Sequence, residues 1–113
     1  MRAQVIEDVP VLGAAGVYTS GTRDMTLVVD DFGISYSYFV VAVDSDQGGT
    51  VEIEQSTDQI VWSVVGPSST YTADSGILSV GAQPTERYAR AVFTNGATPQ
   101  TRFTMTTGVD QVA

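Results

Sequence analysis

Hydrophobic and polar residues alternate along most of this chain with a period of two, which is the period of a β-strand. Val51 and Ile53 alternate with Glu52 and Glu54, and the same pattern recurs over Arg102–Thr106. No long segment places its apolar residues at helical spacing. The pattern therefore predicts an all-β protein in which many strands have one buried face and one solvated face.

Candidate strands follow one another at the spacing of a β-sandwich or barrel, roughly 8–12 residues. We expect the fold to be an antiparallel β-sandwich or jelly roll of roughly 8–10 short strands with an extended N-terminal arm. Turn residues separate the strands at 31–33, 46–49, 66–68 and 95–96. The expected strands are Gln4–Glu7, Gly16–Thr19, Met25–Asp30, Tyr36–Val43, Thr50–Gln55, Val61–Val65, Thr70–Ala73, Ile77–Val80, Arg87–Thr94 and Thr101–Thr106.

The first residues differ in character from the rest of the chain. Pro10, Gly13 and Gly16 interrupt short apolar pieces there, which is typical of an arm or an edge segment. A length of 113 residues with 42% hydrophobic content suits one domain with its own core. We therefore expect an N-terminal arm or edge segment over residues 1–20 and a single β-sandwich domain over residues 21–113.

The segment Tyr36–Val43 is apolar on both faces of the expected strand. Such a strand is either covered by protein on both sides, or its outer face meets another subunit. Together with the N-terminal arm it is the most favourable surface for a protein partner. The candidate partner-binding residues are Val9, Pro10, Val11, Leu12, Tyr36, Tyr38 and Val40.

The composition excludes several kinds of chemistry. The chain has no histidine, lysine or cysteine, so disulfides, thiolate metal sites, Ser-His-Asp triads and Schiff bases cannot form. We expect no enzymatic activity, no catalytic residues and no cofactor. A formal net charge of −8 opposes binding to nucleic acid or to an anionic membrane. No apolar run has the length of a membrane span and no signal-peptide pattern is present, so we expect a soluble protein.

Two groups of carboxylates are candidate sites. Asp44 and Asp46 precede a glycine and alternate as the first ligands of a calcium loop do, but the late glutamate of an EF-hand is missing. The alternative interpretation is a polar hairpin turn. Glu52 and Glu54 share one strand face, where a solvated surface pair is favoured over a glycosidase acid and base.

Trp62 and Arg90 are the candidates for glycan binding. An exposed indole offers a flat face to a sugar ring, whereas the alternation Ile60-x-Trp62-x-Val64 favours a core or half-buried tryptophan. Arg90 alternates with Tyr88 and is expected to form an ion pair with an acidic neighbour or to contact a partner.

Two resemblances rest on these motifs. Ser56-x-Asp58-x-x-x-Trp62 followed by Arg87-Tyr88-x-Arg90 resembles discoidin-like (F5/8 type C) carbohydrate-binding jelly rolls, although Gln59 stands where that family has a turn glycine. The stretch 90–103, with Thr94-Asn95-Gly96 and Gln100-Thr101-x-Phe103, resembles small β-sandwich virion proteins of tailed bacteriophages.

The second resemblance implies a viral structural protein located in the virion and assembled in the host cytoplasm. It implies a capsid decoration or accessory head protein that binds the major capsid protein lattice, copies of itself, or both, with a trimer as a common state in such families. A tail or baseplate β-sandwich and a carbohydrate-binding module are the alternatives.

Overall fold

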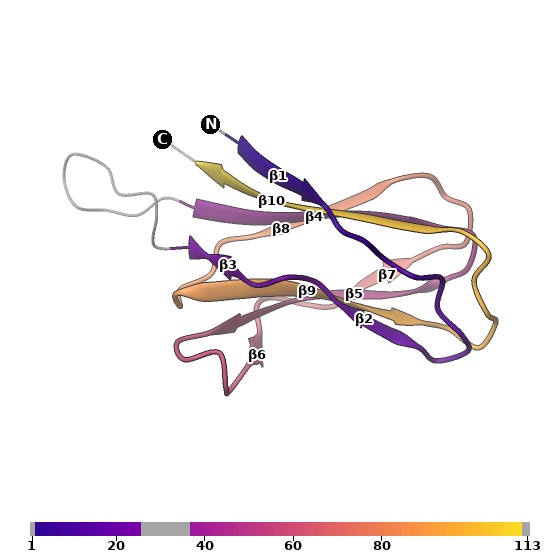
Figure 1. Ribbon diagram of the computed structural model, residues 1–113, viewed down its shortest axis with the longest axis horizontal. Helices are drawn as coiled ribbons and strands as arrows, with labels where there is room; N and C mark the ends of the chain where they lie inside the picture. Colours follow the sequence, from indigo (N-terminus) through magenta and orange to yellow (C-terminus); the bar gives the residue numbers. More distant parts are fainter. Residues whose placement is uncertain (1, 26–36, 112–113) are drawn as a thin grey trace.

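The computed structural model describes residues 2–25 and 37–111, which form two antiparallel β-sheets packed face to face (Figure 1). A four-stranded sheet has the order β1-β10-β4-β8. A six-stranded sheet has the order β2-β9-β5-β6, with β3 paired to β9 and β7 paired to β5. The predicted all-β sandwich is thus confirmed. Within the described ranges, no helix is long and apolar enough to cross a membrane.

The strands agree with the predicted ones to within a few residues over most of the described chain. The exceptions are β3, which was not predicted, and the predicted strand Met25–Asp30, of which only Met25 lies within the described residues. The turn predicted at 31–33 also lies outside them. The strands are β1 (Arg2–Ile6), β2 (Val17–Thr19), β3 (Arg23–Asp24), β4 (Ser37–Ser45), β5 (Gly49–Ser56), β6 (Ser63–Val64), β7 (Ser69–Tyr71), β8 (Leu78–Ala82), β9 (Tyr88–Asn95) and β10 (Phe103–Gln111).

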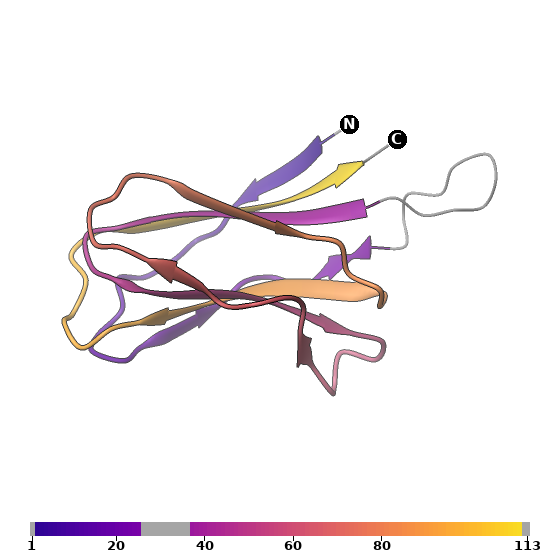
Figure 2. The same ribbon diagram turned by 180° about the vertical axis from the view of Figure 1, so that it is seen from behind.

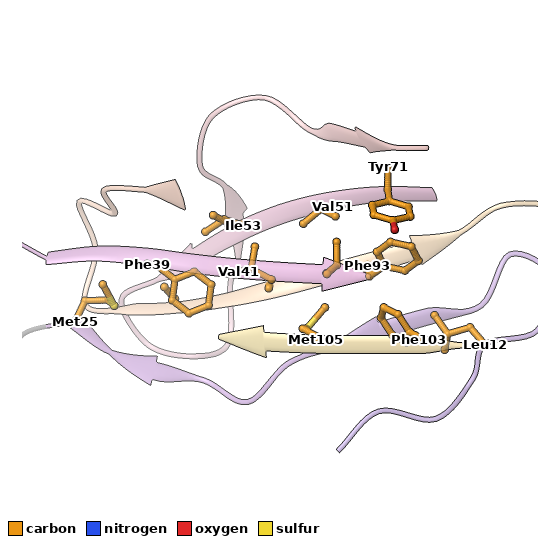
Figure 3. Packing of buried hydrophobic residues seen from close by; sticks show 13 residues of the cluster. Leu12, Met25, Phe39, Val41, Val51, Ile53, Tyr71, Phe93, Phe103 and Met105 are labelled. Atoms are coloured by element: carbon orange, nitrogen blue, oxygen red, sulfur yellow. The ribbon is translucent and has the colours of Figure 1, made fainter. Parts of the chain in front are cut away.

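The core lies between the central strands of the two sheets (Figure 3). Alternate residues of β4 and β10 meet alternate residues of β5 and β9, as the period-two pattern predicts. At one end of the core, the ring of Phe93 lies 4.8 Å from that of Phe103, and Tyr71 and Tyr18 contact these rings edge-on. Burial of each such aromatic side chain stabilises the fold by about 1.5–3 kcal/mol. The fully buried members are Phe39, Val41, Val43, Val51, Tyr71, Ala89, Ala91, Phe93 and Met105.

The N-terminal segment belongs to both layers of the sandwich (Figure 2). β1 pairs with β10 at the edge of one sheet, and β2 pairs with β9 in the other. Between them, Leu12 is only 8% exposed and packs in the core. Residues 2–20 are thus an edge segment that joins the two sheets. Leu12, predicted as a partner-binding residue, is a core residue whose side chain is not available to a partner.

Candidate functional site

The loop between β5 and β6 is held in one shape by its own polar side chains. Ser56 Oγ accepts hydrogen bonds from the backbone N–H groups of Asp58 (3.2 Å) and Gln59 (2.9 Å). Asp58 Oδ1 accepts hydrogen bonds from the N–H groups of Ile60 (2.8 Å) and Val61 (3.0 Å). These N–H groups stabilise the carboxylate and lower the pKa of Asp58. The Ser-x-Asp spacing in the sequence therefore builds this turn.

Gln59 completes the turn with a φ of 63°, in the left-handed region that glycine adopts without cost. This is the position at which the discoidin-like pattern has glycine. The sequence thus departs from that pattern in residue type, although Gln59 has a backbone conformation that favours glycine.

The loop exposes an apolar tip, which we define as Ile60, Val61 and Val64. Their exposed fractions are 81%, 71% and 47%. The alternation with Trp62 had favoured burial of this face, but β5 ends at Ser56 and the turn carries Ile60 and Val64 out of the sandwich. The structure therefore presents Ile60 and Val61 to solvent on a loop that hydrogen bonds hold in place, and Val64 on the short strand β6 that follows.

Trp62 is half-buried against Arg90 at the base of this tip. The guanidinium carbon of Arg90 lies 3.9 Å from the centre of the indole ring, and its Nε donates a hydrogen bond of 2.7 Å to Glu54 Oε1. The expected ion pair of Arg90 is thus present. Since the guanidinium occupies one face of the indole, a sugar ring could stack only on the other face.

The paired carboxylates on β5 are each engaged by a different side chain. Glu54 is paired with Arg90, and Glu52 accepts a hydrogen bond of 2.7 Å from Ser68 Oγ. The two groups lie on the outward face of the six-stranded sheet, opposite in direction to the buried Val51 and Ile53. Glu52 and Glu54 are thus partly exposed side chains on the surface of the sheet.

Asp44 and Asp46 are tied to the loop that precedes β10. Asp46 accepts hydrogen bonds from Thr101 Oγ1 (2.7 Å) and from the backbone N–H groups of Thr101 (3.0 Å) and Arg102 (3.0 Å), and these bonds hold its pKa far below the usual range. Asp44 and Asp74 both pair with Arg102 at 3.0 Å. Within residues 2–25 and 37–111, no three histidine, cysteine or acidic residues are grouped to hold a metal ion.

Two buried amides clamp the N-terminal segment, a role that the sequence did not reveal. Gln100 Oε1 accepts a hydrogen bond from Leu12 N (2.8 Å), and its Nε2 donates to Ser45 Oγ (2.9 Å). Asn95 Nδ2 donates to the carbonyl oxygens of Gly13 and Thr98, both at 2.9 Å. Asn95 and Gln100 belong to the stretch 90–103 that resembles phage virion proteins, so the motif serves to anchor an edge segment.

The other predicted partner-binding residues are divided between two places. Val9 packs against the core, while Pro10 and Val11 are exposed beside it. Tyr38 and Val40 lie on the outward face of β4, with Tyr38 37% exposed. Tyr36 lies outside the described residues. Pro10 and Val11 therefore lie near the end of β4 and Tyr38 near its beginning, so these residues do not form one patch.

Comparison with known proteins identifies one family and one shared fold. The family model described as "Uncharacterised protein YqxG N-terminal domain" matches residues 2–110. The structure titled "Crystal structure of PBSX exported protein XepA" is similar with a TM-score of 0.81 and 21% sequence identity, over 98% of this chain and 38% of that chain. This chain thus spans well under half of the length of that neighbour. No curated protein matches the sequence.

Proposed function

Because the chain belongs to the YqxG N-terminal domain family, we propose that it is a non-enzymatic structural module of a bacteriophage that attaches to a larger protein assembly. In its more specific form, the proposal is a capsid decoration or accessory head protein that binds the major capsid protein lattice. The resemblance of the stretch 90–103 to tailed-phage virion proteins supports the viral setting. A tail or baseplate location is the alternative that the same resemblance allows. The XepA neighbour is named as an exported protein of PBSX.

The observation that carries this proposal is the apolar tip on the β5–β6 loop. Ile60 and Val61 are among the most exposed apolar side chains of the described residues. Their burial against a partner contributes about 1.5–3 kcal/mol for each side chain. The loop is already held by Ser56 and Asp58, so little conformational entropy is lost on binding.

The charged groups of the chain support a structural role over a catalytic one. The chain has no histidine, cysteine or lysine to act as a base or nucleophile. The carboxylates that the sequence singled out are occupied by Arg90, Ser68, Thr101 and Arg102. These contacts give each carboxylate a partner within the fold.

The test is a binding assay with capsid shells assembled without the protein. We expect the wild-type chain to cosediment with the shells and to raise their temperature of disruption. The double variant Ile60→Asp/Val61→Asp should bind at least about tenfold more weakly, because two charges would enter an apolar contact. The matched control is Ile77→Asp, since Ile77 is 74% exposed but lies at the other end of the sandwich, beside β8.

Two results would count against the proposal. If shells without the protein are fully stable and do not bind it, the decoration role is wrong, and labelled protein on tails in electron micrographs would support the alternative location. If a glycan array shows binding that Trp62→Ala abolishes, the chain is a carbohydrate-binding module instead.

A further inference from the structure

Asn95 and Gly96 form a dipeptide that is chemically labile in an unconstrained chain. Asn95 is the only asparagine of the sequence, and glycine follows it. The backbone nitrogen after an asparagine can attack the side-chain carbonyl carbon, and glycine hinders this approach least because it has no Cβ. The bond from Gly96 N to Asn95 Cγ forms, the Cγ–Nδ2 bond breaks, and Nδ2 leaves as ammonia with the proton that Gly96 N gives up. Water then opens the cyclic imide to aspartate or isoaspartate.

The folded chain holds both reacting groups in other hydrogen bonds. Gly96 N donates to Gly48 O at 3.0 Å. Asn95 Nδ2 donates to the carbonyl oxygens of Gly13 and Thr98, both at 2.9 Å, and the residue is only 3% exposed. Attack requires Gly96 N to leave Gly48 and approach Cγ, so the reaction is blocked while these hydrogen bonds last.

Much of this protection comes from the turn at residues 13–16 of the N-terminal segment. Besides its bond to the Asn95 side chain, the turn accepts a hydrogen bond from Asn95 N at Gly16 O and donates one from Ala15 N to Gly96 O, both at 2.8 Å. The first three residues of the turn are exposed, and Ala15 has a φ of 56°, a conformation that costs free energy in a residue with a Cβ. An exposed and strained turn of this kind opens locally more readily than the core strands do.

We infer that Asn95 is a site of spontaneous deamidation that the turn at residues 13–16 shields, and that deamidation releases this turn irreversibly. The site suits an amide and not a carboxylate. Among the described residues, Asn95 Oδ1 has no hydrogen-bond partner, so the side chain is tied to its surroundings through its nitrogen. Aspartate has no donor there, and it would bring a negative charge up to the two carbonyl oxygens that Nδ2 contacts.

Isoaspartate disturbs the same place through the backbone. Asn95 is the last residue of β9 and pairs with Gly49 of β5. In isoaspartate the backbone runs through the side-chain carbonyl carbon, which lengthens it by one carbon and displaces Gly96 from Gly48. Neither product restores the hydrogen bonds to residues 13–16, so the change runs in one direction. It does not depend on the proposed function.

The first experiment follows deamidation of the full chain in mildly alkaline buffer by intact mass and peptide mapping. We expect the folded wild type to react at least about tenfold more slowly than the same chain in guanidinium chloride, because the reaction waits for local opening. Gln100→Ala removes the hydrogen bond to Leu12 N, which anchors the start of the turn, and should speed the reaction at least about threefold. The matched control Ile53→Val removes one buried methyl group in the middle of β5 and should react at the wild-type rate.

The second experiment measures hydrogen exchange of the backbone N–H groups of residues 12–16. The deamidated protein, isolated by ion exchange, and the variant Asn95→Asp should both exchange there at least about tenfold faster than the wild type. Ala97→Asp places the same charge at an exposed position of the same loop and should exchange like the wild type. Circular dichroism checks that each protein is folded.

Four results would overturn the inference. One is deamidation of the folded wild type as fast as in denaturant, and another is a rate in Gln100→Ala that does not exceed that in Ile53→Val. The third is unchanged exchange at residues 12–16 in the deamidated protein. The fourth is equal exchange in Asn95→Asp and Ala97→Asp.

Discussion

At the scale of single residues, the least exchangeable polar side chains are the two buried amides. Gln100 is 4% exposed and Asn95 is 3% exposed, and both bond to backbone groups of the N-terminal segment. An amide needs no counter-ion when buried, and Gln100 uses both its acceptor and its donor, whereas Asn95 uses only its donor. Residues of this kind fix where the edge segment crosses between the sheets.

Replacing Gln100 with alanine should therefore destabilise the protein by about 1–3 kcal/mol, since Leu12 N would lose its partner in a buried environment and Ser45 Oγ would keep only its hydrogen bond from Gln47 N. Urea denaturation measures this loss. Gln47→Ala is the control, because the Gln47 side chain makes only a hydrogen bond of 3.4 Å to Asp46. If both variants lose the same stability, the clamp is not a stabilising element.

The half-burial expected for Trp62 is found, whereas its neighbours Ile60 and Val64 show where alternation failed as a guide to burial. Alternation correctly assigned the inward side of β5 and β9, because pleated strands turn alternate side chains to opposite faces. The same rule applied to Ile60 and Val64 was wrong, since Ser56 and Asp58 end the strand before them. Alternation predicts on which side of the sheet a side chain lies only as far as the strand continues. The hydrogen bonds that form a turn depend on three-dimensional geometry, which residue spacing alone does not give.

At the scale of elements, every described strand except β3 could be predicted from the pattern of the sequence. β4, β5, β9 and β10 each bury several alternating residues, so their pattern extends over eight or nine positions. β3 has two residues and exists only because it pairs with β9. Two residues are too few to show an alternation of apolar and polar positions in the sequence. The hydrogen bonds of Asn95 and Gln100 to the N-terminal segment could not be predicted either, because they join residues that are far apart in the chain.

Gly49 is the strand position that tolerates a side chain least. It begins β5 and pairs with both β7 and β9. A Cβ there would lie 2.4 Å from the carbonyl oxygen of Thr94 and 2.7 Å from the Phe93 ring. Gly49→Ala should therefore lower the free energy of unfolding by about 2 kcal/mol or more, through forced displacement of β9.

Thermal denaturation of Gly49→Ala beside Gly13→Ala checks this expectation. Gly13 is exposed, and an added Cβ there meets no atom within 4 Å. The control should melt close to the wild type. Equal melting temperatures for the two variants would show that β9 accommodates the methyl group, and that the close contact of Gly49 with Thr94 and Phe93 does not limit stability.

At the scale of the whole molecule, acid should loosen the fold through its hydrogen-bonded carboxylates. Hydrogen bonds lower the pKa of Asp46 and of Asp58 in the folded state. A group with a lowered pKa stabilises the fold above its unfolded pKa of about 3.9, and this contribution is lost as the pH falls below that value. The melting temperature should therefore decrease as the pH is lowered from about 4 toward 2.

Asp46→Asn should show a smaller decrease over that range, because it has no carboxylate to protonate at the β4–β5 turn. Melting curves of the variant, the wild type and the control Asp8→Asn, which alters an exposed carboxylate, make the comparison. An unchanged pH dependence in Asp46→Asn would mean that the tie between Asp46 and Thr101 contributes nothing to acid sensitivity.

The pairing of the first strand with the last also determines how the molecule responds to mechanical force. Arg2 and Asp110 are antiparallel partners at one end of the sheet, so a pull on both termini separates β1 from β10 one residue pair at a time. Such unzipping needs less force than shearing a whole strand, since only one pair resists at any moment. It should proceed through Ile6 and stop at Leu12, where Gln100 ties the chain to the opposite end of the sandwich. A tethered molecule would thus yield a short length of chain under load while its core stays folded.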